Sequence, residues 1–247
     1  MARRSSCCTA CSAAAAIGCR PRALQERHAL HLVDLRNHGA SPWSDEMSYH
    51  AMAGDLAALV ERRLGAGPVR LVGHSMGGKA AMVLALTRPE LVERLVVVDI
   101  APVPYPQGYE GYVRAMQGVD LGAIARRADA DAALAPAVPD ASIRGFLLQN
   151  LGGAEGRFAW QPNLAVLLRT MPALTGFPAE LAGRTYAGSA WCLRGARSDY
   201  VGPAGEAALR RHFPSLRVST VAGAGHWPHA ERPAEFLGLL APALATP

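Results

Sequence analysis

A glycine-flanked serine lies between an apolar strand and an apolar helix in the first third of the chain. The motif Gly73-His74-Ser75-Met76-Gly77 follows residues 69–72, which predict a strand, and leads into residues 76–87, which predict a buried, Ala-rich helix. A Gly-x-Ser-x-Gly turn in this position is sharp, so it raises the serine hydroxyl clear of the sheet. The turn also places the Met76 N–H at a helix N-terminus, where it can donate to an oxyanion. We therefore predict that Ser75 is a nucleophile.

A base must accompany Ser75, because a serine hydroxyl is a poor nucleophile near neutral pH. In such sites the chain order is serine, acid, histidine, and the histidine follows the last strand. His226 fits this position, since it lies in the glycine-rich sequence GAGHW after a strand predicted at residues 216–221. We interpret the other histidines near these motifs as structural: His38, His74 and His229.

Two aspartates compete for the role of the acid that orients the histidine. Asp199 comes just after a strand predicted at residues 189–193, which is the usual place for this residue. Asp99 ends a strand predicted at residues 95–98 and is the alternative. We favour Asp199 and keep Asp99 open.

The remaining pattern predicts the architecture. Strand-like and helix-like segments alternate along residues 23–103 and 184–247, an order that implies an α/β core with a mostly parallel sheet flanked by helices. Residues 104–183 have scattered helical stretches, several prolines and no convincing strand, which predicts a helical cap inserted into this core. The strands and helices expected in the core are residues 28–33, 48–64, 69–72, 76–87, 95–98, 189–193, 204–212, 216–221 and 233–240.

Composition excludes several function classes. The net charge of +5 is concentrated in residues 1–22, which hold four arginines and no acidic residue, so the rest of the chain offers no basic stripe for nucleic acid. No apolar run approaches the length of a membrane span. Cys192 is the only cysteine beyond the first 20 residues, which fits a reducing compartment, and we expect a cytoplasmic protein.

Four motifs together resemble one family. They are DLRNHGASP at residues 34–42, GHSMGGK at residues 73–79, VVDIAP at residues 97–102 and GAGHWPHA at residues 223–230. With these motifs the chain resembles the α/β-hydrolase superfamily, and within it the bacterial esterases and acyl-CoA thioesterases related to the mitochondrial abhydrolase-domain-eleven protein. The resemblance implies an α/β-hydrolase fold with a cap, and it carries Ser75 and His226 over as members of a catalytic triad. It also keeps Asp99 in play, since Asp99 has a match in relatives that lack a carboxylate at the position of Asp199.

The resemblance further implies a reaction. A small-molecule acyl ester or acyl thioester is expected as the substrate, cleaved through an acyl-enzyme with neither a metal nor an organic cofactor. A carbon–carbon bond hydrolase or a cofactor-free perhydrolase of the same fold uses the same residue types and stays an alternative. The sequence predicts no particular oligomeric state.

Residues 1–22 depart from the family pattern. As written they contain neither an apolar strand nor the His-Gly loop that supplies the family's second oxyanion donor. Their apolar stretch is short for an export signal, and their Cys-x-x-Cys has no second Cys/His pair at zinc spacing, so we predict no metal site. Besides an export signal and a metal site, a third interpretation is that residues 1–22 are translated from a frame-shifted piece of the gene. The reason is that a one-base shift of permitted codons for residues 5–11 reads VVLLHGL. A chain without the His-Gly loop could be a catalytically impaired, hydrolase-like binding protein, since losing one oxyanion donor typically costs about 10² to 10³ in rate.

Overall fold

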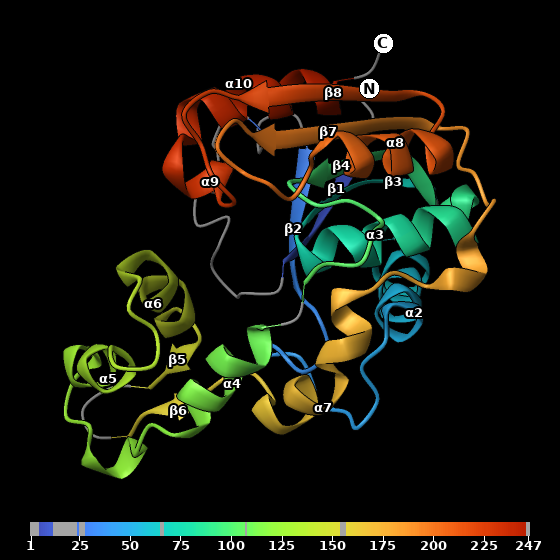
Figure 1. Ribbon diagram of the computed structural model, residues 1–247. Coiled ribbons are helices and arrows are strands. Elements are labelled where there is room, and N and C mark those ends of the chain that lie inside the picture. Colours follow the sequence, from blue (N-terminus) through green and yellow to red (C-terminus); the bar gives the residue numbers. More distant parts are fainter. Residues whose placement is uncertain are drawn as a thin grey trace.

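A six-stranded parallel sheet forms the centre of the molecule (Figure 1). The computed structural model describes residues 5–11, 24, 28–64, 67–106, 108–153 and 157–245. The strands of the central sheet are β1 (Ser5–Cys11), β2 (His28–Asp34), β3 (Val69–His74), β4 (Val92–Val98), β7 (Ser189–Gly195) and β8 (Leu216–Val221). Their order is β2-β1-β3-β4-β7-β8, and every neighbouring pair is parallel. The α/β architecture predicted from the sequence is confirmed.

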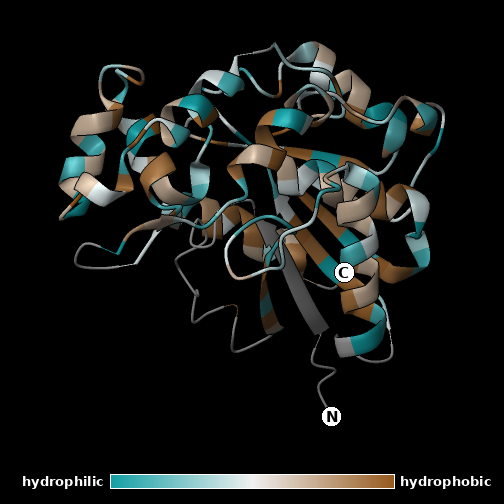
Figure 2. Cartoon of the chain, turned by 90° about the horizontal axis from the view of Figure 1, so that it is seen from below, coloured by the Kyte–Doolittle hydropathy of each residue, from teal (hydrophilic) through white to brown (hydrophobic). Residues whose placement is uncertain are grey.

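Helices cover both faces of this sheet. They are α2 (Tyr49–Leu59), α3 (Met76–Thr87), α8 (Pro203–His212), α9 (Pro228–Glu231) and α10 (Pro233–Leu244). On one face α2, α3 and α8 share a core, whereas on the other face α10 packs Phe236 and Leu240 against the strands. Figure 2 shows largely hydrophobic strands between helices in which hydrophilic and hydrophobic residues are mixed. Among the described helices, none has both the length and the apolar character needed to cross a membrane.

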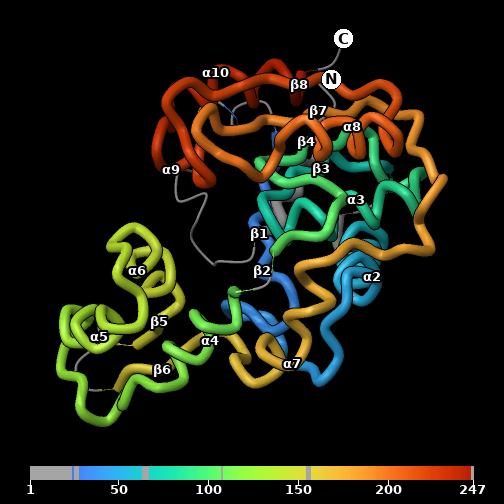
Figure 3. Tube along the Cα trace, in the orientation of Figure 1, coloured from blue at the N-terminus to red at the C-terminus, as the bar shows by residue number. Residues whose placement is uncertain are grey.

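Between β4 and β7 the chain leaves the sheet and then returns to it (Figure 3). We call residues 104–183 the cap. The cap holds α4 (Tyr109–Gln117), α5 (Arg127–Leu134), α6 (Ala141–Leu148) and α7 (Leu164–Thr175), with a hairpin of β5 (Leu151–Gly152) and β6 (Ala159–Trp160). The expectation of no strand in the cap is wrong for this hairpin, whose strands are too short to show an alternating pattern. A second local difference is that the helix expected over residues 48–64 is α2 followed by a π-helical turn, Val60–Leu64.

The backbone of residues 5–11 is an interior strand of the sheet. The sequence of this segment gave no reason to expect an early strand, yet β1 lies between β2 and β3, where Ala10 pairs with Val33 and Gly73. The expectation of a missing strand is therefore wrong. Residues 1–4 and 12–23 lie outside the described residues. The other expectations for this segment stay predictions, among them the loss of an oxyanion donor that follows from the absent His-Gly loop.

The parallel arrangement brings distant parts of the sequence to one edge of the sheet. Ser75 follows β3, Asp99 follows β4, and His226 lies in the loop after β8. Because the carboxyl ends of parallel strands meet at the same edge, these three residues can form one site.

Candidate active site

Ser75 occupies a strained turn between β3 and α3. Its φ of 52° and ψ of −123° lie in a region that non-glycine residues rarely adopt. The turn is tight, since a Cβ added to Gly73 would lie only 2.4 Å from the Gly77 carbonyl oxygen. The Ser75 N–H donates to the Val98 carbonyl oxygen at 3.1 Å. These contacts hold the serine at the carboxyl edge of the sheet.

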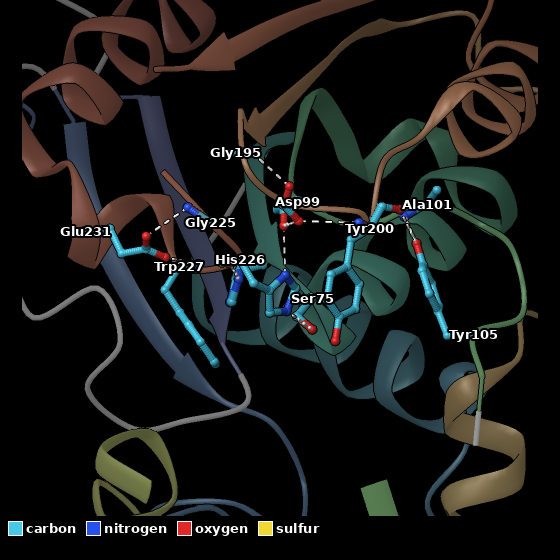
Figure 4. A network of polar contacts seen from close by, with 12 residues as sticks. Ser75, Asp99, Ala101, Tyr105, Gly195, Tyr200, Gly225, His226, Trp227 and Glu231 are labelled. Carbon is cyan, nitrogen blue, oxygen red and sulfur yellow. Dashed lines mark hydrogen bonds and ion pairs between the residues drawn. The ribbon is translucent and has the colours of Figure 1, made fainter. Parts of the chain in front are cut away.

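His226 joins this serine to a carboxylate (Figure 4). Its Nε2 lies 3.1 Å from Ser75 Oγ, and its Nδ1 lies 2.8 Å from Asp99 Oδ2. A carboxylate accepts hydrogen bonds, so Nδ1 carries the proton and Nε2 is left as the acceptor for the serine hydroxyl. The imidazole is therefore oriented to take a proton from Ser75.

The Asp99 side chain is fully buried at the end of β4. Three donors face its carboxylate: the His226 Nδ1–H, the Gly195 N–H at 2.9 Å and the Ser198 hydroxyl. Burial of a charged group is costly unless such partners are present, and here they also fix its orientation. The Asp99 backbone, with a φ of 51°, is the second strained position of the site.

The structure does not bring Asp199 to the histidine, contrary to our preference from the sequence. Its side chain is exposed and has no hydrogen bond or ion pair to any described residue. The cause is the turn after β7, which is pressed against the histidine loop: a Cβ on Gly195 would lie 2.0 Å from the Gly225 carbonyl oxygen. In this turn Ser198 reaches Asp99, and Asp199 is left outside.

Two further groups hold the histidine loop in place. The buried His74 ring donates from Nε2 to the His226 carbonyl oxygen at 2.7 Å. Burial holds the pKa of His74 well below its usual value, so this ring is neutral. Glu231 accepts hydrogen bonds from the N–H groups of Gly225 and Trp227, at 2.8 and 3.2 Å. Sequence reasoning missed Glu231, because a glutamate in the first turn of a short helix carries no distinctive signal.

The remaining two histidines near the site are also buried. The His38 Nδ1–H donates to the Arg36 carbonyl oxygen at 3.1 Å, and the His229 ring packs edge-on against His74, with centroids 4.8 Å apart. Burial lowers the pKa of both rings, that of His229 to about 4. Their contacts are consistent with the structural roles expected for them.

The Met76 N–H is the first backbone donor of α3, where a helix offers it no carbonyl partner. It adjoins Ser75 and points from the positive end of the helix, an arrangement suited to an oxyanion. The family's second donor comes from a His-Gly loop that the sequence as written lacks.

A cavity of about 710 Å³ opens from Ser75 and His226 towards the cap. Both the core and the cap contribute apolar side chains to its wall, among them Ile100, Val113, Met116, Phe146 and Leu167. A cavity with an apolar wall and a few polar groups at one end binds an apolar group and presents its polar end to those groups.

The fold and this site define a class of protein. The alpha/beta hydrolase family model matches residues 13–239, and the chain belongs to this family. It is an ester-hydrolysing enzyme of the esterase and lipase type.

Named relatives agree with that class. The chain is 43% identical over 219 residues to the sn-1-specific diacylglycerol lipase ABHD11 of Mus musculus, covering 86% of this chain and 70% of that protein. It is 34% identical over 218 residues to Esterase YbfF of Escherichia coli K12, covering 88% and 83%. A solved structure of a marine microorganism esterase superimposes with a TM-score of 0.88 at 27% identity, covering 98% of this chain and 95% of the other. The family resemblance expected from the four motifs is confirmed.

Proposed function

We propose that the chain hydrolyses esters or thioesters of apolar acyl groups through an acyl-enzyme formed on Ser75. One observation carries this proposal: Ser75, His226 and Asp99 form a continuous hydrogen-bonded series that opens on an apolar cavity. A geometry of nucleophile, base and orienting acid is what acyl transfer by serine needs.

In the first half of the proposed reaction, Ser75 Oγ attacks the substrate carbonyl carbon and its proton passes to His226 Nε2. Asp99 accepts the Nδ1–H and stabilises the imidazolium that forms. The Met76 N–H donates to the oxyanion of the tetrahedral intermediate. His226 then gives its proton to the departing alcohol or thiol, which leaves the acyl group on Ser75.

In the second half, a water molecule attacks the acyl-enzyme while His226 takes its proton. Collapse of the second tetrahedral intermediate releases the carboxylic acid and returns the proton to Ser75. No atom in this sequence of steps requires a cofactor.

The cavity and the named relatives support an apolar acyl group. The wall of the cavity is apolar on the core side and on the cap side. One relative is named a diacylglycerol lipase and another an esterase. Either an alcohol or a thiol fits the leaving-group role in these steps, so the test includes both.

The test is a panel of p-nitrophenyl esters, from acetyl to dodecanoyl, together with acyl-CoA thioesters of the same chains. Ser75→Ala should lower kcat by a factor on the order of 10⁶, as loss of a triad nucleophile does. A fluorophosphonate probe should label the wild type and leave Ser75→Ala unlabelled. A wild type that shows neither turnover nor labelling would instead be a hydrolase-like binding protein.

A further inference from the structure

The ring of Tyr200 covers one face of the His226 imidazole. The two rings are stacked, with centroids 3.8 Å apart and an interplanar angle of 16°. The hydrogen bonds to Ser75 and Asp99 hold the two nitrogens of the imidazole. They leave the ring able to tilt about the line that joins these nitrogens, and a flat ring against its face prevents that tilt.

The backbone of Tyr200 is anchored to the same network as the acid (Figure 4). Its N–H donates to Ser198 Oγ at 3.3 Å, and the Ser198 hydroxyl donates to Asp99. Its carbonyl oxygen accepts from the Tyr105 hydroxyl at 2.7 Å, and that hydroxyl in turn accepts from the Ala101 N–H at 2.8 Å. Tyr200 is therefore fixed relative to the carboxylate that His226 contacts.

The phenol of Tyr200 extends from this anchor to the cap. Its hydroxyl forms a hydrogen bond with the hydroxyl of Tyr109, which is the first residue of α4. Burial raises the pKa of Tyr200, so the phenol stays neutral and can donate or accept in this bond. A cap helix and the histidine are thus joined by one side chain.

We propose, on the basis of the function proposed above, that Tyr200 is a positioning residue for His226. Tyr109 then couples the position of the imidazole to the position of helix α4. Val113 and Met116 of α4 line the cavity, so an acyl chain that fills the cavity packs against this helix. An acyl chain that packs against α4 and fixes its position therefore also keeps His226 aligned with Ser75. Acyl chains too short to reach α4 gain nothing from the coupling.

The first comparison separates the stack from the hydroxyl. Tyr200→Leu removes the flat ring, whereas Tyr200→Phe keeps it and removes only the hydroxyl. We expect Tyr200→Leu to lower kcat for octanoyl p-nitrophenyl ester by about tenfold to a hundredfold relative to Tyr200→Phe, with KM little changed, because the base is misaligned. Labelling by the fluorophosphonate should slow by a similar factor.

The second comparison tests the link to the cap. Tyr109→Phe and Tyr200→Phe should each lower kcat on the octanoyl ester by about threefold to tenfold, the equivalent of one hydrogen bond, and the double variant should lose no more than either alone. On the acetyl ester both variants should lose less kcat than on the octanoyl ester. Tyr186→Phe is the matched control: its buried hydroxyl donates to the Val92 carbonyl oxygen at 2.9 Å, away from the site, so it should lose stability but keep kcat.

Equal kcat values for Tyr200→Leu and Tyr200→Phe would overturn the positioning role. Additive losses in the Tyr109→Phe and Tyr200→Phe double variant, or equal losses on the acetyl and octanoyl esters, would overturn the coupling. Either result with an active wild type leaves the proposed hydrolase standing. A wild type with neither turnover nor labelling overturns both proposals together.

Discussion

At the scale of single residues, the site distinguishes clearly between two candidates for the acid partner of His226. Asp99 is buried and lies 2.8 Å from Nδ1, whereas Asp199 is exposed. We predict that Asp99→Asn lowers kcat by about 10⁴, because the amide no longer favours the required tautomer or stabilises the imidazolium. Asp199→Asn should stay within about twofold of the wild type, as surface substitutions usually do. Steady-state kinetics on one p-nitrophenyl ester decides between them.

The opposite ranking of the two variants would mean that the turn after β7 rearranges when substrate binds. In that case Ser198, which donates to Asp99, would have to move away as Asp199 enters. A Ser198→Ala variant with unchanged kcat, measured alongside, would support such a rearrangement.

The same residues show how far a sequence can define a site. Ser75 and His226 could be predicted because each has flanking glycines and a fixed place relative to a strand. The choice between Asp99 and Asp199 could not be predicted, because both follow a parallel strand at the same edge of the sheet. What decides it is the close approach of Gly195 to Gly225, a contact between turns that no local pattern encodes.

At the scale of elements, the buried Lys79 of α3 ties the core to both ends of the cap. Its Nζ donates to the carbonyl oxygen of Val103, where the chain leaves the core, at 3.0 Å. It also donates to the carbonyl oxygens of Thr175 and Gly176, where α7 ends, at 3.0 and 2.5 Å. Three acceptors match the three protons of an ammonium, while burial lowers the pKa of Lys79 to about 7.

The three carbonyl oxygens favour the charged ammonium, whereas burial favours the neutral amine. Because burial lowers the pKa in the folded state, the stability of the protein should depend on pH. Between the folded pKa of about 7 and the ordinary value of 10.5, the unfolded chain binds a proton at Lys79 that the folded chain does not. The free energy of unfolding should therefore rise with pH across this window, by up to about 1.4 kcal/mol per pH unit relative to Lys79→Met. Urea unfolding of both proteins at pH 7 and pH 9 measures the difference. Parallel pH dependences would show that the three carbonyls keep the ammonium at its ordinary pKa.

Most elements could be predicted from their periodicity, and the exceptions share a cause. The strand at residues 216–221 and the helix at residues 76–87 have the bounds expected of them. The sequence does not predict the β5–β6 hairpin because its strands are too short for a pattern, and it does not predict β1 because that segment contains no valine, leucine or isoleucine. In both, pairing with neighbouring strands determines the structure, and the sequence of the segment itself does not.

At the scale of the whole molecule, buried neutral histidines make the fold sensitive to acid. Burial lowers the pKa of His38, His74 and His229. Below about pH 6.5 the unfolded chain binds protons at these rings while the folded chain does not, so the free energy of unfolding falls as the pH drops.

We predict that His229→Leu weakens this acid sensitivity. The folded pKa of His229 is about 4, so between pH 6.5 and 4 this ring removes up to about 3 kcal/mol from the stability of the wild type. Neither of its ring nitrogens has a hydrogen-bond partner among the described residues, so an apolar replacement leaves no bond broken there. Urea midpoints at pH 7 and pH 5 should differ less in His229→Leu than in the wild type. An equal difference would place the acid sensitivity in other groups.

At the same scale, β1 is an interior strand of the sheet, yet its residues, SSCCTAC, include no valine, leucine or isoleucine. Interior strands of parallel sheets are usually near-continuous apolar runs. The shifted reading VVLLHGL would supply such a run. It would also place its His-Gly at residues 9 and 10, which pair with Val72 and Gly73 beside the turn that holds Ser75.

The last prediction tests that reading in the protein itself. The variant carries Ser5→Val, Ser6→Val, Cys7→Leu, Cys8→Leu, Thr9→His, Ala10→Gly and Cys11→Leu. We expect it to unfold at a higher urea concentration, since each fully buried valine or leucine contributes about 1.5–3 kcal/mol. We also expect kcat to rise by up to about 10² to 10³ through a second oxyanion donor. A matched variant that keeps Thr9 and Ala10 should gain the stability alone, so equal kcat values in the two variants would remove the His-Gly sequence from the mechanism.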